Sequence, residues 1–200
     1  METWNINGHT LEYIDDGHIY VYEGEVIPSI TQAMKVRFGK KYEGIDKATL
    51  QRASDMGTAI HKAIEEWCKT GAESDYQEVR NFKFLLDKHE MKTVNNEVPV
   101  ILYKDGEALL AGRLDLVIKS TKNGCVGLAD IKRTSTLDKE YLGYQLNLYR
   151  IAYQQCYGDH ISFLRGIHLR EDIRKMVNIP INEKLAWDLV NEWRNQNGDL

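Results

Sequence analysis

The sequence predicts an α/β fold with a mixed central β-sheet flanked by helices. Two stretches with helical periodicity come first, and a run of apolar, β-rich segments joined by turn-like residues follows them. A long helical stretch and further strand-like segments come next. Helices, a run of antiparallel strands, a helix and another strand together indicate an α/β sandwich.

Length and composition limit the possible classes of protein. A chain of 200 residues can form one domain with a real core, and 28 % charged and 42 % hydrophobic residues are ordinary for a globular protein. The net charge of −4 excludes a generally basic nucleic-acid coat protein. We expect a single domain over 1–200, with a core at about 50–170, an N-terminal hairpin and loop at 1–49 and a C-terminal helix at about 182–196.

The cysteines and the hydropathy pattern suggest a cytoplasmic protein. Cys68, Cys125 and Cys156 are scattered and show no zinc or iron–sulfur spacing. An odd, low cysteine count fits a reducing compartment. No apolar run approaches membrane-spanning length, and the polar start of the chain does not resemble a signal peptide. We therefore expect no membrane partner and no iron–sulfur cluster.

The first 50 residues predict a small hairpin, a short helix and a loop. Extended segments are expected at Leu11–Tyr13, His18–Tyr22 and Glu25–Ile27. Ser29 is the expected N-cap of a short helix that ends near Val36. The polar stretch 37–47 predicts a flexible loop.

Apolar periodicity predicts the remaining elements. Helices are expected at Met56–Trp67, Tyr76–His89, Leu137–Tyr157 and about Asn182–Asn195. Ser54 or Asp55 can cap the first of these helices, and Gly71 lies just past its end. Strands are expected at Thr93–Tyr103, Ala108–Ile118, Val126–Ile131, Ile161–Leu169 and Lys175–Ile179.

Two of these strands bring two carboxylates and a lysine together. They are joined near Asn123-Gly124, a strong hairpin signal that, as a two-residue turn, places Asp115 opposite Lys132 and Val117 opposite Asp130. Side chains alternate along a strand, so Asp115, Asp130 and Lys132 share one face. Carboxylates suit Mg²⁺ and a lysine suits phosphate chemistry. A metal-dependent nuclease and a solvated face with an ordinary Asp–Lys pair fit this spacing equally well.

Four other residues are candidates for the same chemistry. His61 is either a metal ligand or a surface histidine, and its position alone favours the surface. Glu97 either completes the acidic cluster or lies on an edge strand. Gln145 and Tyr149, four residues apart on the long helix, either meet a phosphate or base or pack against the core.

A local excess of basic residues precedes the first long helix. It could contact a nucleic-acid backbone, or it could be a solvated loop, which is the interpretation that we slightly favour. The basic side chains are Lys35, Arg37, Lys40, Lys41, Lys47 and Arg52.

These motifs follow the order of the PD-(D/E)XK nuclease superfamily, and the chain most resembles its RecB-like exonuclease branch. That branch includes phage-encoded nucleases and the mitochondrial genome-maintenance exonuclease. The resemblance covers about residues 18–155. It rests on PSIT at 28–31, GTAIH at 57–61, Glu97, GRLD at 112–115, DIK at 130–132 and QLNLY at 145–149.

The resemblance implies a restriction-endonuclease-like core and a bound Mg²⁺ or Mn²⁺ ion. Its implied ligands are His61, Asp115, Asp130 and the backbone carbonyl of Ile131. Such an ion would activate a water molecule for attack on a DNA phosphodiester.

Other residues of the motifs receive catalytic roles from the resemblance. Lys132 resembles the catalytic lysine, which positions water or stabilises developing charge. Glu97 resembles the upstream acidic residue, and Gln145 and Tyr149 resemble the last motif, beside the substrate groove. Arg133 replaces the usual threonine after the lysine, and it is either a phosphate contact or a tolerated change.

The implied activity is that of an exonuclease in recombination, repair or phage DNA processing, in a bacterial or phage-infected cell. The implied partners are DNA, single-stranded or with free ends, a recombinase, annealing or single-strand-binding protein, and further copies of the chain. No phosphate-binding loop of a helicase is present, so unwinding would need a partner. A structure-selective endonuclease, an inactive binding module on the same fold and a different metal-dependent enzyme are the alternatives.

Overall fold

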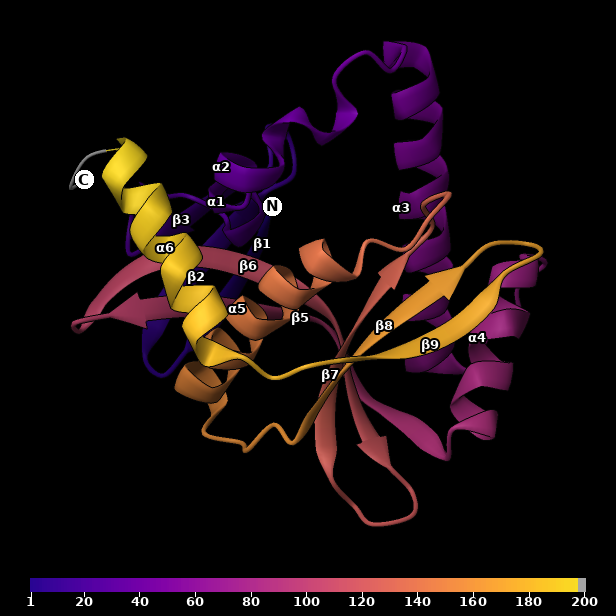
Figure 1. Cartoon of the computed structure of the whole chain (residues 1–200). Helices are drawn as coiled ribbons and strands as arrows, with labels where there is room; N and C mark the ends of the chain where they lie inside the picture. Colours follow the sequence, from indigo (N-terminus) through magenta and orange to yellow (C-terminus); the bar gives the residue numbers. More distant parts are fainter. Residues whose placement is uncertain (198–200) are drawn as a thin grey trace.

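A five-stranded mixed sheet lies at the centre of the protein (Figure 1), as the sequence predicts. The computed structural model describes residues 1–197. The strands follow the order β5-β6-β7-β8-β9, and only the β7–β8 pair is parallel within the described sheet. Their bounds are Met91–Lys104, Glu107–Ser120, Val126–Lys132, Phe163–Leu169 and Arg174–Ile179.

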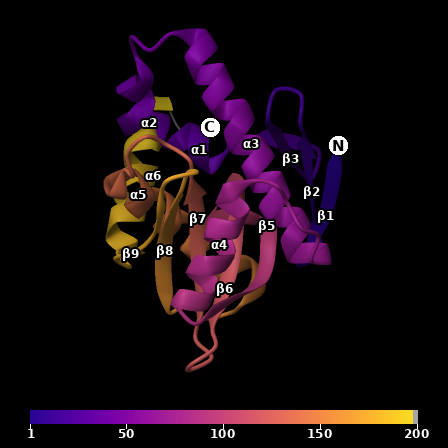
Figure 2. The same cartoon turned by 90° about the vertical axis from the view of Figure 1, so that its right-hand side faces the viewer.

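Helices cover both faces of this sheet, and each pair has its own apolar core. Helices α3 and α4 pack on one face, and α5 and α6 pack on the other (Figures 1 and 2). Their bounds are Lys47–Thr70, Gln77–Lys88, Lys139–Tyr157 and Glu183–Asn197. Among the described residues, no helix combines the length and apolar character that crossing a membrane requires.

A second, four-stranded antiparallel sheet precedes the core. Its strands β1 to β4 follow one another in space as in sequence, at Glu2–Ile6, His9–Ile14, Ile19–Tyr22 and Glu25–Ile27. Strand β1 was not predicted. Asn7 and Gly8, which join it to β2, have φ values of 55° and 88°, and Asn-Gly favours this tight hairpin turn. The sheet joins the core at Ala111, whose amide donates to the carbonyl of Pro28 at 2.9 Å.

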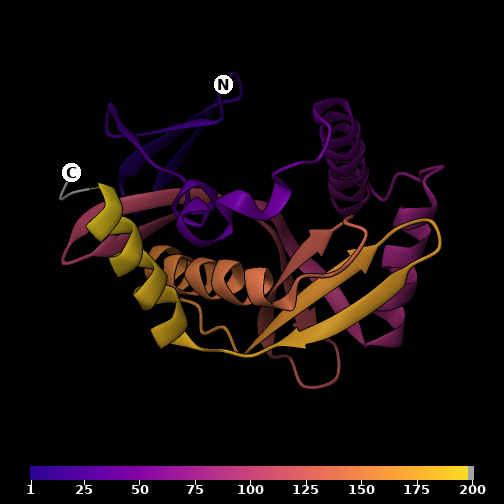
Figure 3. The ribbon, with the colours of Figure 1, turned by 45° about the horizontal axis from the view of Figure 1, so that its top comes forward.

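The connection between the two sheets is more helical than predicted. Ser29 caps α1 (Ile30–Ala33) with a capping box, as predicted. The predicted loop at 37–47 is wrong, because α2 (Lys35–Phe38) and the 3₁₀ turn η1 (Gly39–Tyr42) occupy most of it. Figure 3 shows α1 and α2 between the N-terminal sheet and α3.

Helix α3 begins at Lys47 and not at Met56. The carboxylate of Asp46 caps it by accepting a hydrogen bond from the Thr49 amide at 2.9 Å, so the predicted cap at Ser54 or Asp55 is wrong. Gly71 ends the helix with a left-handed φ of 75°, as predicted. The additional first turns are exposed, and they therefore carry no apolar stripe that a sequence pattern could reveal.

The hairpin of β6 and β7 has a longer loop than the predicted two-residue turn. Ser120 donates its amide to the carbonyl of Cys125, so the loop covers 121–124. Val117 pairs with Leu128, and the register therefore brings Asp115 opposite Asp130. The predicted pairing was displaced by two residues. Because side chains alternate with a period of two, Asp115, Asp130 and Lys132 still share one face.

Candidate metal centre

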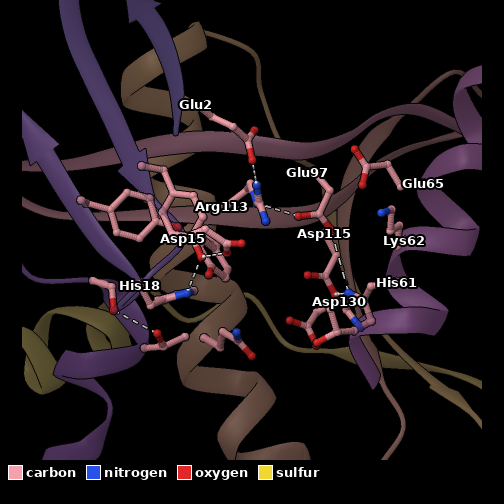
Figure 4. Close-up of a pocket in the computed structure, with 18 of the residues that line it drawn as sticks. Glu2, Asp15, His18, His61, Lys62, Glu65, Glu97, Arg113, Asp115 and Asp130 are labelled. Atoms are coloured by element: carbon pink, nitrogen blue, oxygen red, sulfur yellow. Dashed lines mark hydrogen bonds and ion pairs between the residues drawn. The ribbon is translucent and has the colours of Figure 1, made fainter. Parts of the chain in front are cut away.

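A polar cavity of about 630 Å³ lies between the N-terminal sheet, α3, α5 and the strands β5 to β7 (Figure 4). Most of the predicted catalytic and metal-binding side chains line it. They are His61, Glu97, Asp115, Asp130, Lys132, Gln145 and Tyr149.

Three of these side chains form a compact group of possible metal ligands. One donor atom each of His61, Glu97 and Asp115 lies within 4.8 Å of the others. His61 Nδ1 is 3.9 Å from Glu97 Oε1 and 3.7 Å from Asp115 Oδ2. Two carboxylates and one imidazole suit Mn²⁺, and the carboxylates also suit Mg²⁺. The group can therefore hold a divalent cation.

Helix α3 and strand β5 position His61 and Glu97 of this group of possible ligands. His61 lies on α3 between Ile60 and Ile64, two fully buried residues that anchor the helix to the sheet. Glu97 has a φ of 49°, which is unusual for a residue other than glycine in a strand. The β5–β6 pairs on either side of it are Asn96–Leu116 and Val98–Leu114. The left-handed backbone sets the direction of the Glu97 side chain at the cavity.

Backbone groups of Ile131 contact both His61 and Asp115. The Ile131 amide donates a hydrogen bond to the Asp115 carboxylate. His61 Nε2 is 3.2 Å from the carbonyl oxygen of Ile131, while Nδ1 faces the carboxylates. Histidines that bind a metal commonly donate their second N–H to a carbonyl in this way. The carbonyl that the resemblance implies as a ligand is thus available to His61 as a hydrogen-bond acceptor.

Asp130 and Lys132 adjoin this group as a close ion pair. Lys132 Nζ lies 2.5 Å from Asp130 Oδ2, and Asp130 is only 2 % exposed. Among the described residues, the Lys132 ammonium is the partner of Asp130 Oδ2, whereas Asp130 Oδ1 and Gln145 Oε1 accept no hydrogen bond. Buried oxygens normally have partners. Oxygens without donors beside a carboxylate–imidazole group fit a bound cation.

Burial and neighbouring charges shift the pKa values in this cavity. Burial raises the pKa of Asp130 to about 6. Burial lowers the pKa of His61, but the Asp115 carboxylate and the bond with Glu97 outweigh it and raise the value to about 9. For Lys132, the nearby carboxylates likewise outweigh burial and raise the pKa. Clustered shifts of this kind in a cavity are typical of functional sites.

Gln145 and Tyr149 reach the cavity from α5, and both are buried. Burial raises the pKa of Tyr149 well above its ordinary value, so its hydroxyl stays protonated. Gly112 lets this tyrosine approach, because a Cβ at position 112 would lie 2.8 Å from Tyr149 Cε1. The glycine of the GRLD motif thus has a packing role that the sequence did not indicate.

The predicted substrate-binding cations are not brought together. Arg133 Nε pairs with Glu78 on α4 at 2.8 Å, and Arg133 does not line the cavity. Arg37 is held by Glu192 and by the Tyr144 hydroxyl. Neither Lys35 nor Lys40 belongs to the described lining of the cavity.

Lys41 is a predicted substrate-binding cation that shares a cavity with Lys132. It lines a second cavity of about 210 Å³ together with Lys132, Thr134, Asp138 and Tyr141. Its Nζ is 2.7 Å from Asp138 Oδ2. Because Lys132 lines both cavities, this second cavity adjoins the candidate metal centre.

The N-terminal sheet contributes residues that sequence reasoning missed. Glu2, Tyr13 and His18 line the same cavity, and Arg113 lies between the sheet and Glu97. Arg113 lies within the GRLD motif at 112–115, so its place close to Asp115 in the sequence was a signal that could have found it. Glu2 gave no signal, because only the unpredicted strand β1 brings it to the site.

Comparisons with known proteins give a fold likeness and no family. No protein-family model matches the chain, and no curated protein matches it in sequence. The structure of the protein SSO0001 is 15 % identical, with a TM-score of 0.45, over 86 % of this chain and 76 % of that one. A candidate exonuclease of Eubacterium rectale is 12 % identical, also with a TM-score of 0.45, over 87 % and 82 % of the two chains. Likenesses this distant assign no activity, so a function must be argued from the site.

Proposed function

We propose that the protein is a divalent-metal-dependent deoxyribonuclease of the RecB-like PD-(D/E)XK type, acting as an exonuclease. The observation that carries the proposal is the convergence of a carboxylate–imidazole group and a buried Asp–Lys pair in one cavity. His61, Glu97 and Asp115 form the group, and Asp130 and Lys132 form the pair.

The residues that would hold the cation are His61, Glu97 and Asp115, with Oδ1 of Asp130, which accepts no hydrogen bond, beside them. A bound Mg²⁺ or Mn²⁺ ion would supply Lewis-acid polarisation of a phosphodiester and would make a water molecule more acidic. These ligands are fixed to two strands and one helix, so the site is organised before the substrate arrives.

Lys132 supplies a positive charge beside the reacting phosphate. Its raised pKa keeps the ammonium protonated at neutral pH, and Asp130 holds the ammonium at the cavity. A fixed ammonium there stabilises negative charge that develops on the phosphate oxygens. The amide of Gln145 and the hydroxyl of Tyr149 offer further hydrogen-bonding groups for the substrate strand.

An inactive binding module is less well supported than an enzyme. Such a module would have no need of a buried carboxylate with one oxygen that accepts no hydrogen bond, because that arrangement costs stability. A structure-selective endonuclease remains the second candidate within the nuclease class, because the same ligands would serve it.

Digestion of labelled DNA tests the proposal. With Mg²⁺ or Mn²⁺, the native protein should shorten end-labelled linear DNA and leave closed circular single-stranded and duplex DNA intact. Lys132→Ala and Asp130→Ala should abolish cleavage while keeping a native circular dichroism spectrum, and the exposed-lysine variant Lys88→Ala should remain active. Mutants of the pair as active as the native chain would overturn the proposal, and cleavage of circles would replace the exonuclease by an endonuclease.

A further inference from the structure

We propose that Arg113 is a positioning residue that holds Glu97 ready for a cation, and that Glu2 on the N-terminal strand holds Arg113. This inference rests on the proposed metal site. According to this inference, the small N-terminal sheet helps to position a metal ligand, in addition to forming a wall of the cavity.

The guanidinium of Arg113 is held from three sides (Figure 4). Its Nε lies 2.8 Å from Glu97 Oε2, and its Nη1 lies 2.8 Å from Glu2 Oε1. The guanidinium carbon is 5.1 Å from the centre of the Tyr13 ring. The contacts come from β5, β1 and β2, so one side chain of the central sheet connects both sheets. A planar guanidinium presents its donors in fixed directions, which suits such a bridge.

The bridge divides the two oxygens of Glu97 between two tasks. Oε2 forms an ion pair with Arg113 Nε at 2.8 Å, and Oε1 faces His61 Nδ1 at 3.9 Å. A carboxylate held by one oxygen cannot rotate freely, so the other oxygen stays directed at the candidate cation position. The left-handed φ of 49° at Glu97 supports this interpretation, because such backbone persists only where surrounding contacts hold it.

The two carboxylates of the bridge differ in exposure, and their effects should differ in size. The Glu97 side chain is 18 % exposed, whereas that of Glu2 is 53 % exposed. Outer partners of metal ligands typically contribute about 10- to 100-fold to metal affinity. An exposed ion pair contributes much less. Arg113 should therefore matter more than Glu2, and the effect of Glu2 should depend on Arg113.

A calorimetric titration of the DNA-free protein with Mn²⁺ tests this assignment. Arg113→Lys keeps the charge but cannot span both carboxylates, and it should weaken Mn²⁺ binding about 10-fold. Glu2→Gln should weaken binding about two- to five-fold, as expected for an exposed pair. The double variant should bind no more weakly than Arg113→Lys alone, because Glu2 acts through Arg113. Arg165→Lys, which alters an arginine stacked on Phe163 away from the cavity, should bind like the native protein.

The outcomes separate this inference from the proposed function. If the native protein binds no Mn²⁺, the metal site itself is wrong and the inference falls with it. If the native protein binds Mn²⁺ and Arg113→Lys binds equally well, only the inference is overturned. A lower melting temperature with unchanged Mn²⁺ affinity would make the bridge purely structural. Lost DNA affinity with unchanged Mn²⁺ affinity would make Arg113 a phosphate contact. Should Arg113→Lys fail to fold, the exposed variant Glu2→Gln decides by the same titration.

Discussion

The carboxylate of Asp115 accepts a hydrogen bond from the backbone amide of Ile131, with 2.7 Å between Oδ2 and the nitrogen. The same oxygen lies 3.7 Å from His61 Nδ1. The regular β6–β7 pairing extends as far as Leu116 and Ala129, and beyond it the Asp115 side chain contacts the backbone of the neighbouring strand. Asp115 therefore both connects the two strands through a hydrogen bond and belongs to the possible metal ligands, and variants can separate these two roles.

Asp115→Asn should preserve the fold and remove the chemistry. The amide oxygen can still accept from Ile131, so the melting temperature should stay close to the native value. Loss of the negative charge should abolish tight Mn²⁺ binding and lower the pKa of His61, because the Asp115 carboxylate is the main neighbour that raises it. Calorimetry and an NMR titration of His61 measure both effects.

Asp115→Ala is the matched comparison. It removes the acceptor as well as the charge, so it should cost about 1–3 kcal/mol more stability than Asp115→Asn. An Asn variant that binds Mn²⁺ like the native protein would remove Asp115 from the ligand set.

The metal-free protein should lose stability as the pH rises from about 7 to 9.5. The pKa of His61 is raised from 6.5 to about 9 on folding, so its stabilising contribution is complete below the unfolded value and disappears as the pH passes the folded value. The expected loss is about 1–3 kcal/mol. Asp130, with a pKa of about 6, shifts stability only at lower pH and does not disturb this window.

Urea unfolding in the presence of a chelator measures this loss. His61→Gln should show a flatter dependence on pH over the same range, since the titrating group is gone. Equal slopes for the native protein and the variant would show that His61 does not carry the effect.

The shared face of Asp115, Asp130 and Lys132 on the β6–β7 hairpin could be predicted, although the predicted register of the two strands was wrong. The predicted turn at Asn123-Gly124 is shorter than the actual loop by two residues, and an even displacement leaves side chains on the same face. The apolar stripe of α3 likewise predicted where His61 lies, but not the exposed start of the helix at Lys47. Periodic patterns report buried faces, so elements without a buried face escape them.

Contacts between distant segments could not be predicted. Glu2 and Arg113 are 111 residues apart, and Arg133 and Glu78 are 55 apart, so no local spacing links them. Arg133 follows Lys132 in sequence, yet alternation along the strand turns it away from the cavity and towards α4. The structure places Lys132 in the lining of the cavity, and the motif gave no guide to the direction of the next side chain.

Lys41→Ala should weaken DNA binding more than Lys40→Ala. Lys41 and Lys132 both lie over the ring of Tyr141, at 5.1 and 5.7 Å from its centre, so a strand whose phosphate meets Lys132 passes close to Lys41. Lys40 has the same charge and is the next residue in the chain, but it does not line the second cavity. It is therefore a matched control.

Fluorescence anisotropy with single-stranded DNA, at several salt concentrations and with Ca²⁺ in place of Mg²⁺, measures the difference. Loss of one phosphate contact should reduce the salt slope by about 1 for Lys41→Ala. Equal slopes for the two variants would show that the strand does not pass the second cavity.

Gly112→Ala should destabilise the protein and disturb the cavity, whereas Gly57→Ala should stabilise it. A Cβ at position 112 would lie 2.8 Å from Tyr149 Cε1 and 3.3 Å from Ile30 Cδ1, so Tyr149 would have to move. Overpacking of this kind costs about 1–3 kcal/mol. Position 57, on α3, has open space around its Cβ, and replacing a glycine inside a helix gains about 0.5–1 kcal/mol.

Thermal unfolding of the two variants measures both signs in one experiment. Cleavage assays should show lower activity for Gly112→Ala and native activity for Gly57→Ala, because Gly112 and Tyr149 belong to the described lining of the cavity and Gly57 does not. A Gly112→Ala variant with native stability and activity would mean that Tyr149 moves aside at no cost. In that case its close packing against β6 would not be needed to shape the site.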